Sequence, residues 1–116
     1  MEGNFKNTYN FSKRLKESKK ILDRYPTRIP IIVEKHSQCE LPTIDKCKYL
    51  VPKDMKIGQF IFEIRNRIKM KSSHALFITI NNKLVSSSSL VSGVYDEESE
   101  EDGFLYIIYS SENTFG

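Results

Sequence analysis

The sequence has no tryptophan, only two cysteines and no long apolar run. A helix that crosses a bilayer needs roughly 18 predominantly apolar residues, and no stretch of these 116 residues approaches that length. The first residues, Met1 to Lys6, lack the apolar segment of a secretory signal peptide. Cys39 and Cys47 are too few for a disulfide framework. We therefore expect a cytoplasmic protein that folds without disulfide bonds.

The residue patterns of metal and catalytic sites are also lacking. His36, Cys39 and Cys47 are candidate metal ligands, but they do not have the paired spacing of a zinc site. No Ser/His/Asp or Cys/His constellation indicates nucleophilic catalysis. The sequence thus predicts no metal, no cofactor and no enzymatic activity.

Charge is distributed unevenly although the net charge is only +3. Residues 1–24 hold seven bases and three acids, whereas the stretch from residue 90 onward holds seven acids and no base. This polarity favours approach of an acidic partner to the basic end, and the alternative is that these charges form solvated helix faces. Because there is no nucleic-acid-binding motif or aromatic platform, we expect no nucleic-acid partner.

Hydrophobic periodicity predicts the secondary structure. Phe11, Leu15, Leu22 and Tyr25 form one stripe of a helix over 11–24, with a short helix before it. Apolar runs and turn residues then predict strands at 28–34 and 48–51, a helix at 57–70, a strand at 75–80, a hairpin into 83–85, a weak helix at 90–98 and a final strand at 104–109. Pro30 indicates an edge or bulge position for the first strand.

This order predicts an α+β fold. A long helix between two strand pairs, with the last strand returning to the sheet centre, is the β-grasp arrangement. The two helices at the start are additions to it. We expect one domain over 1–116, divided into a helical subdomain (1–25), a β-grasp core (26–110) and a flexible tail (111–116).

Several longer motifs resemble those of one known family. They are the run from Tyr25 to Lys35, Lys48-Tyr49-Leu50-Val51-Pro52, Gly58-Gln59-Phe60, Ile64-Arg65-x-Arg67-Ile68, the run from Glu101 to Tyr106 and the run from Tyr109 to Gly116. Together they are similar to the landmarks of the autophagy-related protein 8 family, which includes GABARAP and the microtubule-associated protein light chains. The resemblance spans the whole chain and implies a ubiquitin-like fold with two additional N-terminal helices.

The resemblance implies that Gly116 is the point of conjugation. In the family, an activating enzyme and a conjugating enzyme transfer the glycyl carboxyl group to the amine of phosphatidylethanolamine, and a cysteine protease processes and delipidates the protein. A glycine has no Cβ, so its carboxylate can enter a narrow channel without steric hindrance. The implied protein is a cytoplasmic modifier that becomes lipid-anchored on autophagosomal membranes. The alternative is a non-conjugated module of the same fold that serves trafficking or binds microtubules.

The resemblance also implies a docking face for partners with aromatic-x-x-aliphatic motifs, which bind as an added strand on the 46–52 edge. The implied aromatic pocket comprises Glu17, Ile21, Pro30, Ile32, Lys48, Leu50 and Phe104. The implied aliphatic pocket comprises Tyr49, Val51, Pro52, Met55, Phe60, Glu63, Ile64 and Arg67. Arg28, Lys46 and Lys48 would attract acidic residues that flank the motif. The alternatives are core packing for the apolar residues and solvated faces for the charged ones.

Three positions depart from the family. Glu63 replaces an aliphatic residue, and a helical ion pair with Arg67 worth about 0.2–0.5 kcal/mol would hold it aside; otherwise the aliphatic pocket is shallower or more polar. Ser86-Ser87 replaces two prolines, which predicts a looser loop. Lys56 replaces a threonine helix cap, with Asp54 as the possible substitute.

Overall fold

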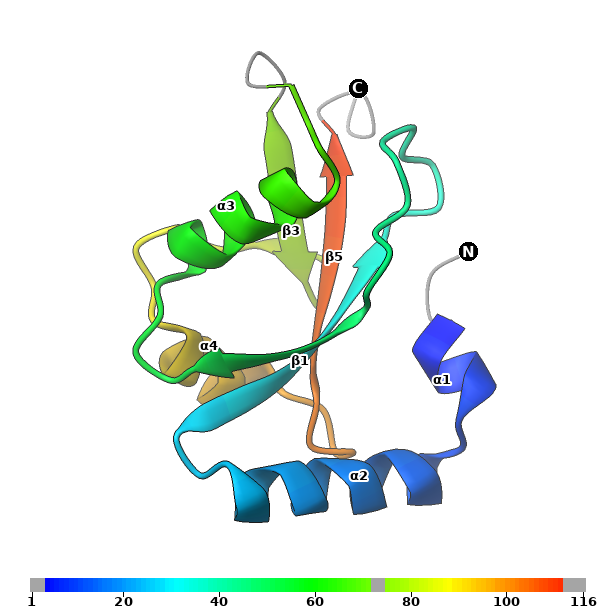
Figure 1. Cartoon of the computed structure of the whole chain (residues 1–116), viewed down its shortest axis with the longest axis vertical. Coiled ribbons are helices and arrows are strands. Elements are labelled where there is room, and N and C mark those ends of the chain that lie inside the picture. Colours follow the sequence, from blue (N-terminus) through cyan, green and yellow to red (C-terminus); the bar gives the residue numbers. More distant parts are fainter. Residues whose placement is uncertain (1–3, 72–74, 112–116) are drawn as a thin grey trace.

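The computed structural model describes residues 4–71 and 75–111. Within these residues the chain forms four helices and one mixed five-stranded sheet (Figure 1). In chain order the elements are α1 (Asn4–Thr8), α2 (Phe11–Arg24), β1 (Arg28–Lys35), β2 (Lys48–Pro52), α3 (Ile57–Arg67), β3 (Leu76–Ile80), β4 (Lys83–Leu84), α4 (Val91–Glu98) and β5 (Leu105–Ser111). The predicted order of elements is confirmed.

The five strands form one sheet in the order β2-β1-β5-β3-β4. β5 is last in the chain but lies in the centre, where it runs parallel to β1 and antiparallel to β3. α3 packs on one face of the sheet, and α1 and α2 lie on the other (Figure 1). This is the predicted ubiquitin-like β-grasp fold with two additional helices at its N-terminal side.

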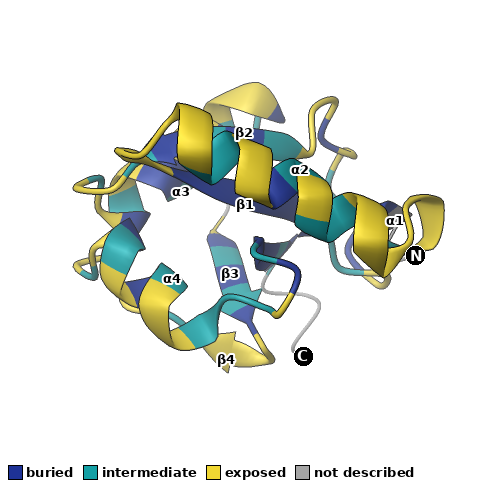
Figure 2. Cartoon of the chain, turned by 90° about the horizontal axis from the view of Figure 1, so that it is seen from below, coloured by how far each residue is buried: buried dark blue, intermediate teal, exposed yellow. Residues whose placement is uncertain are grey.

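Two clusters of buried side chains hold the layers together. The larger one joins β1 residues Ile29, Ile31 and Val33 to Phe60 and Ile64 of α3. The smaller one, on the opposite face, contains Phe5, Ile32, Phe104 and Tyr106. Both faces of β1 are therefore buried, and each fully buried large apolar side chain contributes about 1.5–3 kcal/mol. Figure 2 shows α2 lying over this buried strand with its outer side exposed.

The prediction of an edge or bulge position for Pro30 is wrong. β1 lies between β2 and β5, and Pro30 pairs in regular register with Leu50. Val33 donates its N–H toward β2, to the Cys47 carbonyl, so strand alternation points the Pro30 nitrogen toward β5. Pairing with β5 begins only at Ile31. The missing N–H of Pro30 therefore costs no ladder hydrogen bond.

The predicted helix over 57–70 is too long. α3 ends at Arg67, because Lys69 adopts a left-handed conformation with φ of 55°. The Met70 N–H donates to the Arg65 carbonyl at 3.1 Å, and the Lys69 N–H donates to the Asn66 carbonyl at 3.2 Å. These two bonds form a Schellman motif, whose left-handed position is usually a glycine. A lysine occupies it here.

The start of α3 is also capped differently from the prediction. Asp54 does not cap it; the Gln59 side chain accepts the Lys56 N–H at 2.9 Å. The Ile57 and Gly58 N–H groups donate to the carbonyls of Ser89 and Ser87, both at 2.9 Å. The serine loop that was expected to be loose is thus tied to the helix through its backbone.

The bounds of the remaining helices and strands are close to those predicted. Asn81 and Asn82 both have positive φ, as a tight two-residue hairpin turn requires, which confirms the predicted turn. β5 continues to Ser111, beyond the predicted strand end at 109 and past the predicted tail boundary. The rest of the predicted tail, from 112 onward, lies outside the described residues.

Candidate functional site

β2 is an edge strand of the sheet, as predicted for the 46–52 segment. Tyr49 and Val51 pair with Ile31 and Ile29, and the Val33–Cys47 hydrogen bond fixes which backbone groups face β1. By alternation, the N–H and C=O groups of Lys48 and Leu50 face away from the sheet. One outer group is already used, because the Arg28 guanidinium donates to the Leu50 carbonyl at 3.2 Å. A further strand could add to this edge.

The side chains of β2 alternate between two environments. Tyr49 and Val51 are buried against the α3 face, whereas Lys48 and Leu50 are half-buried on the α2 face. The β2 residues predicted for the aromatic pocket, Lys48 and Leu50, therefore lie on the opposite face of the strand from Tyr49 and Val51 of the aliphatic pocket. Pro52, also predicted for the aliphatic pocket, shares the alternation of Lys48 and Leu50. β2 brings the two sets together at one edge.

On the α2 face, an ion pair connects the helix to the edge strand. Lys48 pairs with Glu17, and both side chains remain partly exposed. Next to Glu17, a hollow of about 300 Å³ is lined by Glu17, Lys20, Ile21, Arg24 and Tyr25. Ile32 and Phe104 are completely buried in the smaller core cluster, against which Ile21 packs. They can form only the floor of an aromatic pocket, whereas Ile21 and Leu50 are half-exposed at its rim.

On the α3 face, the buried ring of Tyr49 forms the centre of the site. It packs edge-on against Phe60, with ring centroids 5.5 Å apart. Lys46 Nζ lies 5.1 Å and the Arg67 guanidinium 5.9 Å from its centroid, within the range of a cation–π contact. The Tyr49 hydroxyl is buried and has no hydrogen-bond partner among the described residues. Burial raises the pKa of Tyr49 to about 12, and the nearby Arg67 charge opposes this shift.

The remaining aliphatic-pocket residues divide by exposure. Phe60 and Ile64 are fully buried, so they form the floor of the site. Pro52 and Met55 are half-exposed, and Glu63 is exposed. The predicted Glu63–Arg67 ion pair is wrong: Arg67 Nε donates to Asp45 Oδ1 at 3.0 Å, and within the described part of the chain no ion pair joins Glu63 to Arg67. Arg67 forms its ion pair with the loop residue Asp45, and the Glu63 carboxylate remains exposed.

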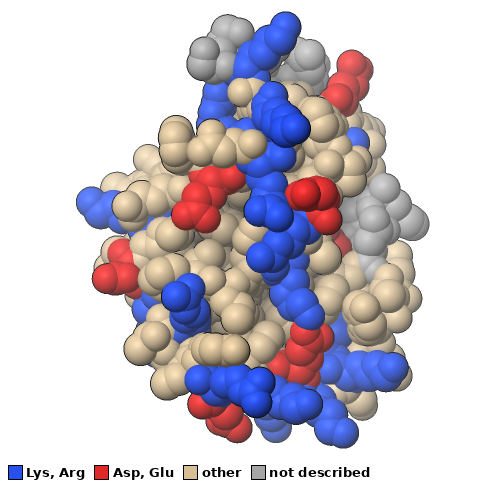
Figure 3. All heavy atoms as spheres, in the orientation of Figure 1, with Lys and Arg blue, Asp and Glu red and all other residues tan. Residues whose placement is uncertain are grey.

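Positive charge gathers around this edge. Figure 3 shows a band of Lys and Arg side chains that descends across this face of the molecule toward α2. Of the three cations predicted to attract acidic flanks, Lys48 is paired with Glu17, and Arg28 is bonded to a carbonyl. Lys46 is exposed, and the described residues offer it no ion-pair partner. It is therefore the cation of the three that is most available to a ligand.

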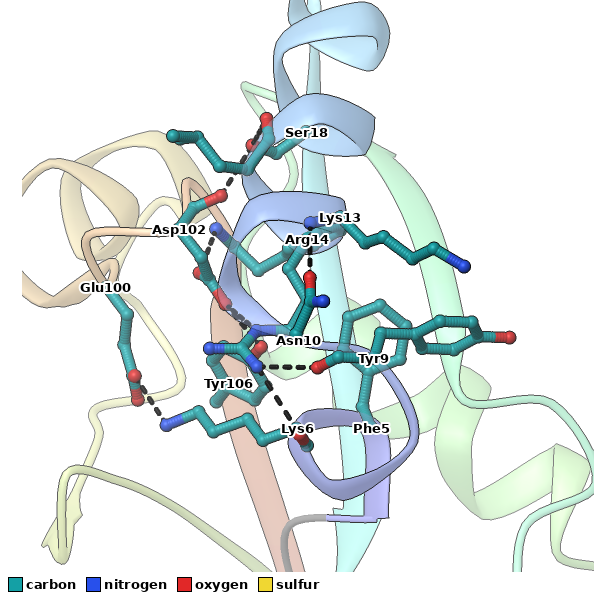
Figure 4. Close-up of polar contacts among 12 residues, drawn as sticks. Phe5, Lys6, Tyr9, Asn10, Lys13, Arg14, Ser18, Glu100, Asp102 and Tyr106 are labelled. Atoms are coloured by element: carbon teal, nitrogen blue, oxygen red, sulfur yellow. Dashed lines mark hydrogen bonds and ion pairs between the residues drawn. The ribbon is translucent and has the colours of Figure 1, made fainter.

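The position of α2, and so of the hollow, depends on a polar cluster around Asp102 (Figure 4). Its carboxylate accepts from Arg14 Nε at 2.9 Å, from the Tyr106 hydroxyl at 2.6 Å and from the Phe104 N–H at 3.0 Å. Its carbonyl accepts the Ser18 hydroxyl at 2.5 Å. Burial first, and then the hydrogen bond to Asp102, raise the pKa of Tyr106. This cluster fixes α2 on the sheet.

A second set of contacts fixes α1. The Phe5 N–H donates to the buried Glu34 carboxylate at 2.9 Å, and Lys6 pairs with Glu100 (Figure 4). The Phe5 ring packs edge-on against Phe104 at 5.2 Å. The two helices are thus attached to the sheet by both ionic and aromatic contacts.

Some residues that line the hollow on the α2 face were not predicted as site residues. Lys20, Arg24 and Tyr25 line the hollow, although Tyr25 had been assigned to the core stripe of α2. In fact Phe11 and Tyr25, at the two ends of that stripe, are 45% and 41% exposed, and Ser18 is the buried residue of the helix. No sequence signal identifies Ser18, because its burial comes from the contact with Asp102.

Three other expectations concern residues or groups beyond this site. Gly116 lies outside the described residues. No helix within 4–71 and 75–111 has both the length and the apolarity needed to cross a membrane. Across the same residues, no three His, Cys, Asp or Glu side chains are grouped so that they could hold a metal ion.

Comparison with known proteins gives one consistent family. A family model described as "Autophagy protein Atg8 ubiquitin like" matches residues 13–116. Autophagy-related protein 8e of Arabidopsis thaliana is 52% identical over 97% of this chain and 92% of its own length. Autophagy-related protein 8 of Mycosarcoma maydis is 49% identical over 100% of this chain and 98% of its own. The crystal structure of Trypanosoma brucei ATG8 superposes with a TM-score of 0.91 at 36% identity and covers 97% of both chains.

Proposed function

The chain belongs to the Atg8 family of ubiquitin-like autophagy proteins, and we propose that it is a modifier joined through Gly116 to phosphatidylethanolamine. The match to the family model extends to residue 116, which supports this assignment of the reacting glycine. In this proposal the chain is the substrate of an activating and a conjugating enzyme and of a processing and delipidating cysteine protease. It does not itself catalyse a reaction.

Conjugation would move the protein from the cytoplasm to autophagosomal membranes. Each buried lipid CH₂ contributes about 0.8 kcal/mol, and a single acyl chain binds only marginally and reversibly. Phosphatidylethanolamine brings two chains, so one covalent bond to the lipid amine would hold the protein firmly on the bilayer.

Once anchored, the protein recruits cargo receptors and adaptors through the β2 edge. The observation that carries this part of the proposal is that Tyr49 and Val51 lie on one face of β2, whereas Lys48 and Leu50 lie on the other. In an extended strand, side chains alternate between faces, so two residues three positions apart point in opposite directions. An aromatic-x-x-aliphatic peptide added to β2 would therefore place one side chain on the α2 face and the other on the α3 face.

The physical properties of the edge predict reversible binding. Burial of each anchoring side chain provides about 1.5–3 kcal/mol, and ordering the peptide costs part of this gain. Lys46 is placed to attract an acidic flank of the motif. We expect micromolar affinity that weakens with salt.

Conjugation is tested by the mass of the peptide that contains Gly116, compared between membrane and soluble fractions of the native cell. We expect phosphatidylethanolamine on Gly116 in the membrane fraction, and loss of membrane attachment in Gly116→Ala. Full attachment of this variant would overturn the assignment. If Gly116 always carries a free carboxylate, under starvation as well, the chain is instead a non-conjugated module that acts in trafficking or on microtubules through its docking edge.

Peptide docking is tested separately by titration with a Trp-x-x-Leu peptide. Leu50→Glu introduces a charge on the α2 face of the edge strand, and we expect it to abolish binding without unfolding the protein, because Leu50 is only half-buried. Leu84→Glu is the matched control, since Leu84 is 66% exposed on β4 at the opposite edge of the sheet. Equal binding by both variants would contradict docking at β2.

A further inference from the structure

The end of β5 identifies the part of the surface that would face a membrane. Ser111, the last described residue, pairs with Leu76 at the start of β3. Paired strand residues lie about 5 Å apart, so Ser111 ends beside the segment that enters β3. Residues 112–116 can span at most about 18 Å. A lipid on Gly116 would therefore bind within this distance of the end of the sheet where β3 begins.

The segment that leads toward this end is basic. Residues 64–71 contain four cations, Arg65, Arg67, Lys69 and Lys71, and no acid. Arg67 is paired with Asp45, whereas Lys69 and Lys71 are exposed and have no ion-pair partner in the described part of the chain. Met70, between them, packs against the larger core cluster. Because Met70 is held by this core contact, the backbone positions of its neighbours Lys69 and Lys71 are held as well.

Two features distinguish Lys69 and Lys71 from ordinary solvent-exposed charges at the end of a helix. Lys69 occupies a left-handed position, φ 55°, that a glycine would occupy at lower energy. The acid-rich segment 96–102 precedes Leu105, at the opposite end of β5 from Ser111. The seven residues of β5 separate these ends by about 20 Å. The acid-rich segment 96–102 is thus kept away from the end that would approach a bilayer.

We propose that Lys69 and Lys71 contact anionic lipid headgroups and orient the conjugated protein on the membrane. This inference rests on conjugation at Gly116. The expected partner is a bilayer surface that carries acidic phospholipids, because a bilayer attracts cations within about 10 Å of its surface at 0.1 M salt. With this end toward the bilayer, β2 runs along the side of the sheet, and its docking edge stays accessible to partners (Figure 1).

The test uses the full chain and a chemical tether in place of the conjugating enzymes. Gly116→Cys is coupled to a maleimide derivative of phosphatidylethanolamine, and the exposed Cys47 is replaced by serine; Cys39 is buried. The vesicles contain phosphatidylcholine alone or with phosphatidylserine. An amine-reactive reagent then labels lysines, and mass spectrometry measures the rate at Lys69, Lys71 and Lys19, an exposed lysine of α2.

We expect phosphatidylserine to slow labelling of Lys69 and Lys71 about fivefold, with recovery at high salt and no change at Lys19. In Lys69→Asn, a residue that tolerates the left-handed conformation, the protection of Lys71 should decrease while the fold is kept. Equal labelling on the two kinds of vesicle overturns the proposal. Protection of Lys19 in place of Lys69 and Lys71 also overturns it, in favour of a membrane-facing α2.

This result and the conjugation result are separable. Because the maleimide tether bypasses the conjugating enzymes, unprotected lysines reject the lipid contact and leave the assignment of Gly116 untouched. Conversely, a free Gly116 carboxylate in cells rejects conjugation, whatever the labelling shows.

Discussion

Arg14 and Asp102, 88 positions apart in the sequence, form an almost fully buried ion pair of 2.9 Å. The Arg14 side chain is 12% exposed and that of Asp102 only 2%. The pair connects α2 to the loop before the central strand β5. It thus helps to determine where α2 lies on the sheet, and so where the hollow lined by α2 residues lies.

Removal of the Asp102 carboxylate should strongly destabilise the protein. Asp102→Ala leaves the Arg14 charge buried without compensation, which costs about 3–5 kcal/mol. Urea denaturation would measure this change in the free energy of unfolding. Asp96→Ala, at an exposed position of α4, is the control and should change stability by no more than about 0.5 kcal/mol. A similar small effect for both would mean that the ion pair does not fix α2.

Gly103 should not tolerate a side chain. Its φ is +88°, and a Cβ there would lie 2.3 Å from Ser18 Oγ. Gly103→Ala should therefore lower the free energy of unfolding by at least about 1–3 kcal/mol. Gly93→Ala makes the same chemical change inside α4, where nothing lies within 4 Å of the added methyl group, and should stabilise by about 0.5–1 kcal/mol. Thermal unfolding of the two variants should shift in opposite directions.

Lys69→Gly should stabilise the protein. The left-handed conformation costs a residue with a Cβ roughly 1–2 kcal/mol, and a glycine removes this cost, so we expect a gain of about 1 kcal/mol. Lys71→Gly removes the same charge at a residue outside the Schellman motif and should give no gain. A gain from both, measured by urea denaturation, would indicate relief of charge repulsion in place of backbone strain.

Tyr49 should make stability fall at alkaline pH. Burial raises the folded-state pKa from 10.0 to about 12, so above pH 10 the unfolded chain loses its phenolic proton first. The stability that the neutral phenol contributes is complete below pH 10 and is lost as the pH rises toward 12. In Tyr49→Phe this loss should be smaller, as shown by chemical denaturation at a series of pH values. Below pH 10 the variant should be at least as stable, because its buried hydroxyl has no partner among the described residues.

Glu63 should weaken the binding of motifs with an aliphatic side chain. It is exposed on α3, one turn before Arg67, whose guanidinium lies near the Tyr49 ring. Glu63→Val should tighten binding of a Trp-x-x-Leu peptide by about fivefold, since partial burial of a valine is worth about 1 kcal/mol. Glu97→Val changes an exposed acid of α4 and should leave affinity unchanged. Calorimetric titration that finds no difference between Glu63→Val and the original chain would count against a role for Glu63 in partner choice.

Local sequence signals predicted most of the fold. The turn at Asn81-Asn82 was predictable because few residues accept positive φ at two adjacent positions. The central place of β5 followed from the order of the elements and from resemblance to the family. The end of α3 was missed because Lys69 is not a residue that normally marks a helix end.

The candidate site was only partly predictable. Alternation in β2 predicted that one large side chain stays near the surface, and Leu50 is half-buried. The ion pair of Arg67 could not be predicted, because its partner Asp45 comes from a loop whose path is not a local property of the chain. The N–H of the neighbouring residue Ile44 donates a hydrogen bond to the Tyr109 hydroxyl of β5, 65 positions away. For the same reason, the exposed state of Glu63 was not apparent from its i, i+4 spacing to Arg67.

The sequence by itself determined the elements, their order and the family, because periodicity, turn residues and motifs are local properties of the chain. Tertiary structure decided which charges pair, which side chains are floor or rim in the proposed docking site, and which end of the sheet carries exposed lysines. Those outcomes depend on contacts such as Arg14–Asp102 and Ser18–Asp102, between residues more than 80 positions apart. Such contacts form only when the helices dock on the finished sheet.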